Sequence, residues 1–266
     1  ILAETEKNPR GTFNYPLFPD LVNRINGQPV AEFSNFLLQN FGNDWSKAFI
    51  RDSLLHSLLE HTSLDTQAFR PAIVFINGEY WGIHNIRQRP DEYYLAERYQ
   101  VDPDDIVILD DNQMLFRGSP GDEISYKDLL EYVSENDPRD EKVYSIVKSQ
   151  VDIENFIDYK VAEIYAANTD WPLSNTRYWQ LKNPDPSKGM DGRWRWILYD
   201  TDRGFGYDPQ FEGYNHRTLE AAEDIHQNGF LLNALLKNDQ FQVQFINSWA
   251  DHLNTSFRVE RVIERI

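Results

Sequence analysis

Four side chains in the second half of the chain could together support metal-dependent chemistry. Asp170 and Asn175 lie five positions apart in the stretch NTDWPLSNTRYW, and Asp200 and Asp202 follow in RWRWILYDTDRGFG. Oxygens of Asp and Asn side chains are ligands that Mg²⁺ and Mn²⁺ prefer. A further carboxylate with its own orientation could accept the proton of an attacking hydroxyl group. These residue types suit a metal-dependent reaction of a hydroxyl, provided that the fold brings them together.

The elements around these residues predict that they meet. Apolar spacing indicates a long amphipathic helix at about 153–167, and two strand-like runs follow it, TRYWQLK and RWRWILYD, joined by the turn-rich NPDPSKGMDG. A β-hairpin brings its two ends together. Asn175 and Asp200 should therefore lie side by side, and Asp170, on the same loop as Asn175, can face the same point.

The order of these residues is that of a protein-kinase active site. There the pattern D-x-x-x-x-N precedes a hairpin and a further Asp, which opens the D-F-G segment. The first Asp orients the hydroxyl, while the Asn and the later Asp hold the metal ions. In this chain Asp170 and Asn175 match the first pair, and Asp200 opens DTDRGFG. The competing interpretation is that these residues only cap the helix and the turns.

The chain resembles the CotH kinases, a family named for a bacterial spore-coat kinase and having an atypical protein-kinase-like fold. Four stretches carry the resemblance. They are FRPAIVFINGEYWGIHNIRQRPDEYYL (69–95), NTDWPLSNTRYW (168–179), RWRWILYDTDRGFG (193–206) and, in support, GNDW with RD (within 42–52). The resemblance implies transfer of a phosphoryl group from ATP to a Ser or Thr of a protein, with Mg²⁺ or Mn²⁺ bound. It also implies an extracellular, cell-surface or spore-associated setting.

The resemblance also implies roles for individual residues. Asp170 would be the catalytic-loop aspartate, Asn175 and Asp200 would be metal ligands, and Asp202 would be an additional one. Residues 85–90 would lie near the adenine of the nucleotide, which makes Asn85 and Arg87 the candidate nucleotide-binding residues.

The implied fold class is α+β, an atypical protein-kinase-like fold with two lobes. Residues 1–90 would form an incomplete N-terminal lobe, with a helix at 46–61 as the counterpart of the kinase αC helix and a hairpin at 72–87 around Asn77-Gly78. Residues 91–266 would form a mostly helical C-terminal lobe. The other elements expected there are helices at 91–99, 125–134, 141–149, 229–237 and 239–254, a strand at 106–109 and a loop at 110–124.

Two features depart from the family pattern. Members usually carry a phosphate-binding lysine on strands ahead of the segment that starts here, and this chain begins after that region, so we expect a longer protein with those strands upstream. Lys7 is the only lysine before Lys47, and its surroundings are turn-like, so it does not suit that role. Gln88 stands where the family more often has Glu.

Composition narrows the alternatives. Lys and Arg number 26 against 43 Asp and Glu, so the net charge is −17, which disfavours nucleic acid and anionic membranes as partners. Cysteine is absent, and no apolar run reaches the ~18 residues of a membrane span.

Two other functions remain open at this stage. A non-catalytic surface or adhesion module could keep the fold without phosphoryl transfer. A carbohydrate-active enzyme could use paired carboxylates beside a tryptophan platform. The four tryptophans that would form such a platform suit a packed core better, because they alternate along strands. They are Trp171, Trp179, Trp194 and Trp196.

Overall fold

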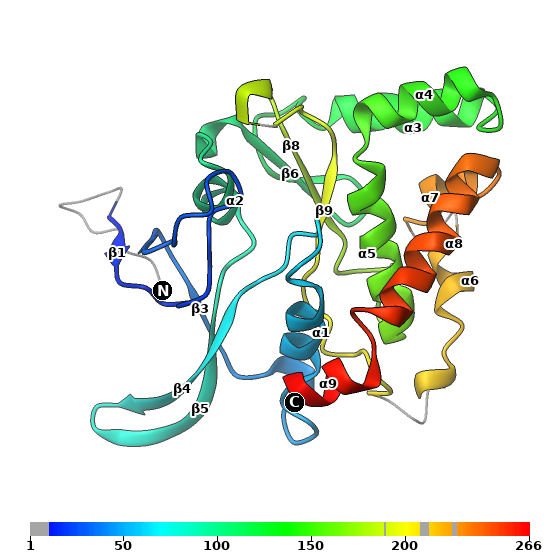
Figure 1. Cartoon of the computed structure of the whole chain (residues 1–266). Coiled ribbons are helices and arrows are strands. Elements are labelled where there is room, and N and C mark those ends of the chain that lie inside the picture. The colour runs from blue at the N-terminus through cyan, green and yellow to red at the C-terminus, as the bar shows by residue number, and fades with distance from the viewer. Residues whose placement is uncertain (1–10, 189, 208–212, 225–227) are drawn as a thin grey trace.

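The computed structural model describes residues 11–188, 190–207, 213–224 and 228–266, and these form a mixed structure of small antiparallel sheets and helices, in agreement with the α+β class (Figure 1). Lys7 lies outside the described residues. The strands are β1 (Phe13–Asn14), β2 (Glu32–Phe33), β3 (Leu37–Gln39), β4 (Phe69–Ile76), β5 (Glu79–Arg87), β6 (Ile106–Asp110), β7 (Met114–Arg117), β8 (Arg177–Leu181) and β9 (Arg195–Ile197). The α-helices are α1 (Arg51–Leu59), α2 (Glu92–Tyr99), α3 (Ile124–Glu135), α4 (Glu141–Gln150), α5 (Ile153–Ala166), α6 (Thr218–Ala222), α7 (Phe230–Leu235), α8 (Asp239–Asn254) and α9 (Val259–Arg265).

Two antiparallel sheets organise the chain. The first has the strand order β3-β5-β4, and the second has the order β7-β6-β8-β9, while β1 and β2 form a separate two-stranded ribbon. Helix α5 lies against the second sheet, and α7 and α8 lie on the other side of α5 (Figure 1). No helix among the described residues is both long enough and apolar enough to cross a membrane.

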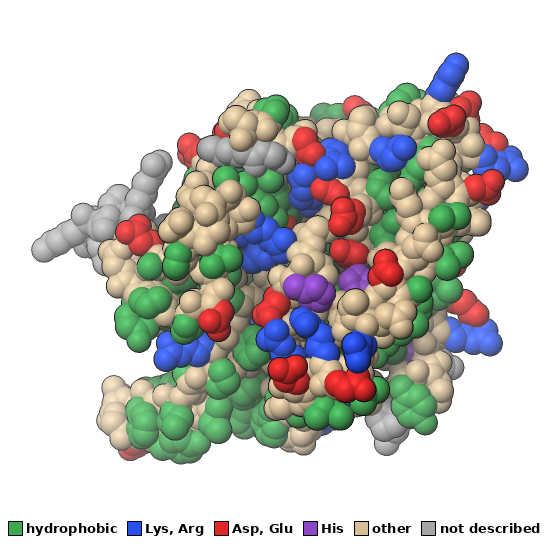
Figure 2. Space-filling view, in the orientation of Figure 1, with side chains coloured by type: hydrophobic (Ala, Val, Ile, Leu, Met, Phe, Trp, Pro, Cys, Tyr) green, Lys and Arg blue, Asp and Glu red, His purple; other side chains and the backbone are tan. Residues whose placement is uncertain are grey.

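The predicted hairpin around Asn77-Gly78 is confirmed. Asn77 and Gly78 have φ angles of 52° and 86°, the positive values that a two-residue hairpin turn of this type requires. The strands run longer than expected, from Phe69 to Arg87, and the ribbon projects from the body of the molecule (Figure 1). Large apolar side chains along it are exposed and form an apolar surface on the projecting ribbon (Figure 2). They are Ile73, Phe75, Ile76, Tyr80, Trp81 and Ile83, which we call the ribbon patch.

The helix expected at 46–61 is shorter than predicted. Helix α1 begins at Arg51, because the buried Asp44 carboxylate accepts hydrogen bonds from the backbone N–H groups of Ala48 and Arg51 and pairs with the Arg51 side chain. Ser46 and Phe49 have φ angles of 69° and 66°. The segment before Arg51 is therefore a series of turns held by Asp44, despite its helical apolar spacing.

Several further elements differ from expectation, among them α9 (Val259–Arg265), where no helix was expected. Residues 114–117, expected in a loop, form β7 beside β6, because Asp111 and Gln113 have φ angles of 39° and 64° and turn the chain back sharply. Helix α6 lies in a segment for which polarity indicated no element. The other expected helices are present within a few residues of their predicted bounds.

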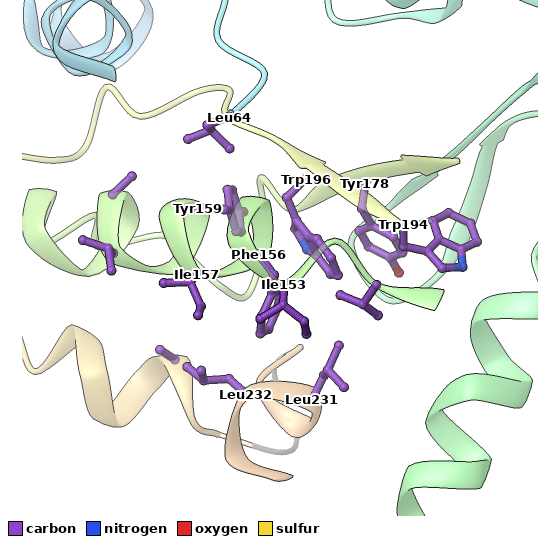
Figure 3. Packing of buried hydrophobic residues seen from close by; sticks show 14 of the residues in the cluster. Leu64, Ile153, Phe156, Ile157, Tyr159, Tyr178, Trp194, Trp196, Leu231 and Leu232 are labelled. Atoms are coloured by element: carbon purple, nitrogen blue, oxygen red, sulfur yellow. The ribbon is translucent and has the colours of Figure 1, made fainter. Parts of the chain in front are cut away.

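The main hydrophobic core lies between α5 and the second sheet. Trp171, Trp179, Trp194 and Trp196 are all 2% exposed or less. Trp196 packs against Phe156 of α5 and stacks on Tyr178 of β8, with ring centroids 4.6 Å and 5.5 Å away (Figure 3). The alternating tryptophans are thus core residues, and they form no exposed platform for a sugar.

Truncation of Trp196 should be among the most destabilising single changes. Trp196→Ala removes a fully buried indole, and such deletions cost about 3–5 kcal/mol of unfolding free energy. Trp81→Ala is the matched control, because Trp81 is 61% exposed and its loss should change stability by less than about 0.5 kcal/mol. Urea denaturation measures both values. Equal losses in the two variants would contradict this account of the core.

Candidate active site

The end of α5 positions Asp170. Ala167 has a φ of 51° and ends the helix, and the buried Asn168 side chain donates to Glu163 Oε2 at 2.9 Å. The backbone N–H and the hydroxyl of Ser174 both donate to the Asp170 carbonyl, at 3.2 Å and 3.1 Å. These bonds fold residues 170–174 into a compact loop, and the Asp170 carboxyl group makes a side-chain hydrogen bond with Asn175.

The hairpin of β8 and β9 brings Asn175 to Asp200, as predicted. Arg177 pairs with Ile197 in the sheet, so the two strand ends are adjacent. The Asn175 side-chain amide donates to the Asp200 carbonyl at 3.4 Å. Both residues have left-handed backbone conformations, with φ angles of 63° and 55°, which Asn and Asp adopt more readily than most residues. Residue type and local geometry therefore agree at both positions.

The pKa shifts of Asp170 and Asp200 show that Asp170 lies close enough to interact electrostatically with the carboxylates after the hairpin. Burial is the largest cause that raises the pKa of Asp170, the Arg203 guanidinium opposes the rise, and the charge of Asp202 adds to it. Burial also raises the pKa of Asp200 to about 6, and the charges of Asp202 and Asp170 add to that rise. The charge of Asp202 thus disfavours the ionised forms of both Asp170 and Asp200, and an added cation would relieve this repulsion.

The oxygen donors present suit one divalent cation such as Mg²⁺, with water and substrate phosphates completing its coordination. Among the described residues, no three histidine, cysteine or acidic side chains are grouped closely enough to form a metal site by themselves. Asn175 and Asp200 can supply two oxygens, and Mg²⁺ is typically held by one or two carboxylates together with water and substrate phosphates. Oδ1 of Asp170 is buried without a hydrogen-bond partner in the described part of the chain. Such an oxygen marks a place where a donor or a cation is expected.

Asp202 makes a different set of contacts. Its two carboxylate oxygens accept hydrogen bonds from the backbone N–H and the side-chain amide of Asn43, at 2.6 Å and 3.1 Å. Gly42 lies so close that an added Cβ would sit 2.3 Å from Asp202 Oδ2. The structure therefore places this carboxylate against the turn at Gly42-Asn43, and its predicted role as an additional metal ligand remains a prediction.

A buried ion pair lies next to Asp200. Arg87, at the end of β5, pairs with Asp52 on α1, and both side chains are almost fully buried. The other Asp52 oxygen accepts hydrogen bonds from the backbone N–H and the hydroxyl of Thr201, at 2.8 Å and 3.0 Å. Burial lowers the pKa of Arg87 to about 10, while the charge of Asp200 raises it. The residue next to Asp200 is thus fixed to α1, and the Asp200 charge faces a buried cation.

Residues 85–90, which were predicted to lie near the adenine of a nucleotide, include the buried Arg87. Asn85 is two residues earlier on the same strand, so it shares a strand face with Arg87, and it is buried as well. Gln88 accepts a hydrogen bond from the Ala68 backbone N–H at 3.0 Å through its side-chain oxygen. A glutamate carboxylate, which the family more often has here, could accept the same bond, so this departure is compatible with the local structure.

His56 lies beside Asp52, and its titration tests how the residues around the Arg87–Asp52 ion pair are buried. Its side chain is fully buried, and its Nδ1 accepts the Gln67 backbone N–H at 2.9 Å, which leaves the proton on Nε2, 3.4 Å from Asp52 Oδ1. Burial, with a smaller effect of the Arg98 charge, lowers the pKa of His56 from its ordinary 6.5 to about 3. The folded protein therefore keeps His56 neutral at pH values where the unfolded chain binds a proton.

His56 should make the protein less stable in mild acid. The folded pKa is below the unfolded one, so this contribution is complete above about pH 6.5 and is lost as the pH falls toward 3. One proton gives a slope of at most about 1.4 kcal/mol per pH unit. His56→Asn keeps an acceptor for Gln67 at the place of Nδ1 but cannot titrate, so urea unfolding from pH 4.5 to 8 should show a smaller slope. An unchanged slope would show that His56 does not titrate in this way.

A large cavity lies apart from Asp170, Asn175 and Asp200. It has a volume of about 980 Å³, and its walls include His56 and Ser57 of α1 and Arg98 of α2. Asp170, Asn175 and Asp200 do not line it. The candidate site is therefore defined by the convergence of its side chains, and not by this cavity.

Sequence reasoning missed Asp52, Asn43 and Glu163. Asp52 and Asn43 fall within a stretch that supports the family resemblance, but nothing in their spacing shows which distant residue they contact. Glu163 occupies a core-facing position of α5, is fully buried, and has its pKa raised to about 8 chiefly by burial. A charged residue inside the predicted apolar face was the one signal that could have found it.

A comparison with family models agrees with the resemblance seen in the sequence. The model described as CotH kinase protein matches residues 5–266, nearly the whole chain. No curated protein matches the chain. The chain belongs to the CotH kinase family.

Proposed function

We propose that this protein transfers the γ-phosphoryl group of ATP to a Ser or Thr hydroxyl of a protein substrate, with Mg²⁺ or Mn²⁺ bound. The observation that carries the proposal is the meeting of Asp170, Asn175 and Asp200 at one end of the β8–β9 hairpin. Their order and their chemical types are those of kinase phosphoryl transfer. Membership of the CotH kinase family supports the same reading.

Each residue has a separate task in this proposal. Asp170 orients the substrate hydroxyl and accepts its proton, because its Oδ1 has no hydrogen-bond partner among the described residues. Asn175 and Asp200 hold the metal, whose charge neutralises the phosphate oxygens as negative charge develops on them. With a pKa of about 6, Asp200 is mostly ionised at neutral pH and so can bind a cation, which would relieve the repulsion from Asp170 and Asp202.

Arg87 and Asp52 support a two-lobed arrangement. Protein kinases require an ion pair between a strand lysine and a helix αC glutamate. Here Arg87 of β5 and Asp52 of α1 make a buried strand-to-helix ion pair beside Asp200. In the proposed arrangement, the β3-β5-β4 sheet and α1 form the N-terminal lobe, and residues 91–266 form the other. Nε of Arg87 is buried and has no hydrogen-bond partner among the described residues.

A second candidate function is a non-catalytic interaction module, and the ribbon patch favours it. Six exposed apolar side chains on one projecting hairpin are typical of a surface that meets another protein. The surface or spore setting implied by the family remains a prediction under either function. The carbohydrate alternative loses its motivation, because all four of its tryptophans are buried.

Nucleotide-dependent stabilisation tests the proposal without knowledge of the substrate. The purified chain is heated with ATP alone, with Mn²⁺ alone and with both. Ligand at 100 times its dissociation constant should add about 2.7 kcal/mol of stability, and only the pair should give that effect. A shift by both together, followed by transfer of labelled phosphate to protein, supports a kinase. Stabilisation that is absent with both ligands would favour the interaction module.

A further inference from the structure

Lys160 is a buried cation with no charged partner in contact. Its side chain is 1% exposed in the middle of α5, and its Nζ lies 4.7 Å from the ring centroid of Trp171, 5.4 Å from that of Phe156 and 5.6 Å from that of Tyr159. No carboxylate of the described residues lies within ion-pair distance, and its ammonium group makes no hydrogen bond to them. Burying an unpaired ammonium group is costly. An anion bound beside the ammonium group would offset this cost, whereas without one the group loses its proton more easily.

Glu163, one turn further along α5, does not supply that anion. Its Oε2 accepts the Asn168 amide, and it makes no ion pair with Lys160. Burial raises the pKa of Glu163 to about 8 and lowers the pKa of Lys160 to about 7, so burial disfavours the charged form of both groups. The charge of Glu163 raises the pKa of Lys160 and the charge of Lys160 lowers the pKa of Glu163, but burial is the larger cause for both groups.

A cavity lies against Lys160. Its volume is about 90 Å³, which is larger than one water molecule requires and sufficient for a small oxyanion. Polar and aromatic side chains share the wall, and Phe156, Tyr178 and Trp196 on its apolar side appear in Figure 3. The polar residues that line it with Lys160 are Asn112, Gln113, Thr176 and Asn228. The Lys160 ammonium and the side-chain amides of Asn112, Gln113 and Asn228 can donate several hydrogen bonds to the oxygens of an anion.

We propose that Lys160 and these side-chain amides bind a small oxyanion, of the size and charge of sulfate, in this cavity. The bound anion would supply the negative charge that Lys160 lacks. The site is separate from Asp170 and Asp200, neither of which lines the cavity. The proposal does not depend on phosphoryl transfer.

The cavity adjoins the groups that fix the loop containing Asp170. Asn228 Nδ2 and the Thr176 hydroxyl both donate to the Pro172 carbonyl, at 3.0 Å and 3.5 Å, and both residues line the cavity. Trp171, the residue after Asp170, covers the Lys160 ammonium. An anion at this position would therefore stabilise the loop from its core side.

Sulfate tests the proposal. The melting temperature is followed while sodium sulfate is titrated against sodium chloride at matched ionic strength. A specific site gives a shift that saturates, whereas general salt exclusion gives one that rises without saturation. Lys160→Met keeps the length and apolar stem of the side chain but removes the charge, so the saturating part should disappear. Lys142→Met, an exposed lysine on α4, is the matched control and should retain it.

The proposal fails if the unaltered protein shows only the non-saturating shift, or if Lys160→Met keeps the saturating one. Asn112→Ala gives a second readout that does not disturb the core, because Asn112 is exposed at the edge of the cavity. It should weaken sulfate binding several-fold while leaving the melting temperature in chloride unchanged. Unchanged sulfate binding in this variant would place the anion elsewhere.

Discussion

Asp170→Asn is expected to lower phosphoryl transfer by about 10²–10⁴-fold, the usual contribution of a general acid–base group. The amide has nearly the shape of the carboxyl group but cannot accept the substrate proton. Asparagine at position 170 can keep the side-chain hydrogen bond to Asn175, and Asp170 is not a metal ligand in this proposal, so nucleotide binding with Mn²⁺ should persist. Initial rates of labelled phosphate transfer give the first quantity, and the thermal shift with ATP and Mn²⁺ gives the second.

Asp128→Asn is the matched control for that measurement. Asp128 is an exposed carboxylate on α3, so its loss should alter neither rate nor binding. The assignment of Asp170 would be wrong if Asp170→Asn kept its transfer rate. Loss of the metal-dependent shift in this variant would instead make Asp170 part of the metal site.

Asp200→Asn is expected to abolish the metal-dependent part of nucleotide stabilisation, about 2.7 kcal/mol at 100 times the dissociation constant of the unaltered protein. Asparagine adopts the left-handed backbone that residue 200 requires, with its φ of 55°. The change removes the charge that attracts the cation and relieves repulsion from Asp170 and Asp202. Stability without ligand should therefore be equal or higher, so lost binding cannot be attributed to unfolding.

The two variants separate the two roles. Thermal melts of Asp170→Asn and Asp200→Asn with ATP, with and without Mn²⁺, are compared side by side. Retention of the metal-dependent shift in Asp200→Asn would show that Asp200 is not a ligand. Equal loss of binding in both variants would show that the carboxylates act as one cation site, without a dedicated general base.

The part of the site that sequence could predict is local in the chain. Asn175 and Asp200 flank one hairpin, so the pairing of two strands was enough to place them together. Asp170 precedes Asn175 on the same loop, and the helix before it showed a clear apolar period. Most helices were predictable for the same reason, because the apolar spacing and the capping residues that define a helix lie within about fifteen consecutive residues.

The part that sequence could not predict depends on distant partners. Asp202 bonds to Asn43, 159 positions away, and the Arg87–Asp52 pair links a strand to a helix that precedes it in the chain. A side chain's type does not show which distant group will meet it. Helix α1 was predicted too long for a related reason. The apolar period continues back to residue 46, but the Asp44 carboxylate binds the backbone there in a non-helical form.

The ribbon patch has a consequence for the behaviour of the protein in solution. The chain as a whole has a net charge of −17, whereas the projecting hairpin presents mostly apolar side chains. At low ionic strength mutual repulsion keeps copies apart, but the screening length falls from about 10 Å at 0.1 M salt to about 3 Å at 1 M. High ionic strength therefore screens the electrostatic repulsion between molecules, but it does not weaken the apolar attraction between their ribbon patches. Concentrated stocks should remain clear in dilute buffer and should turn cloudy during a high-salt purification step.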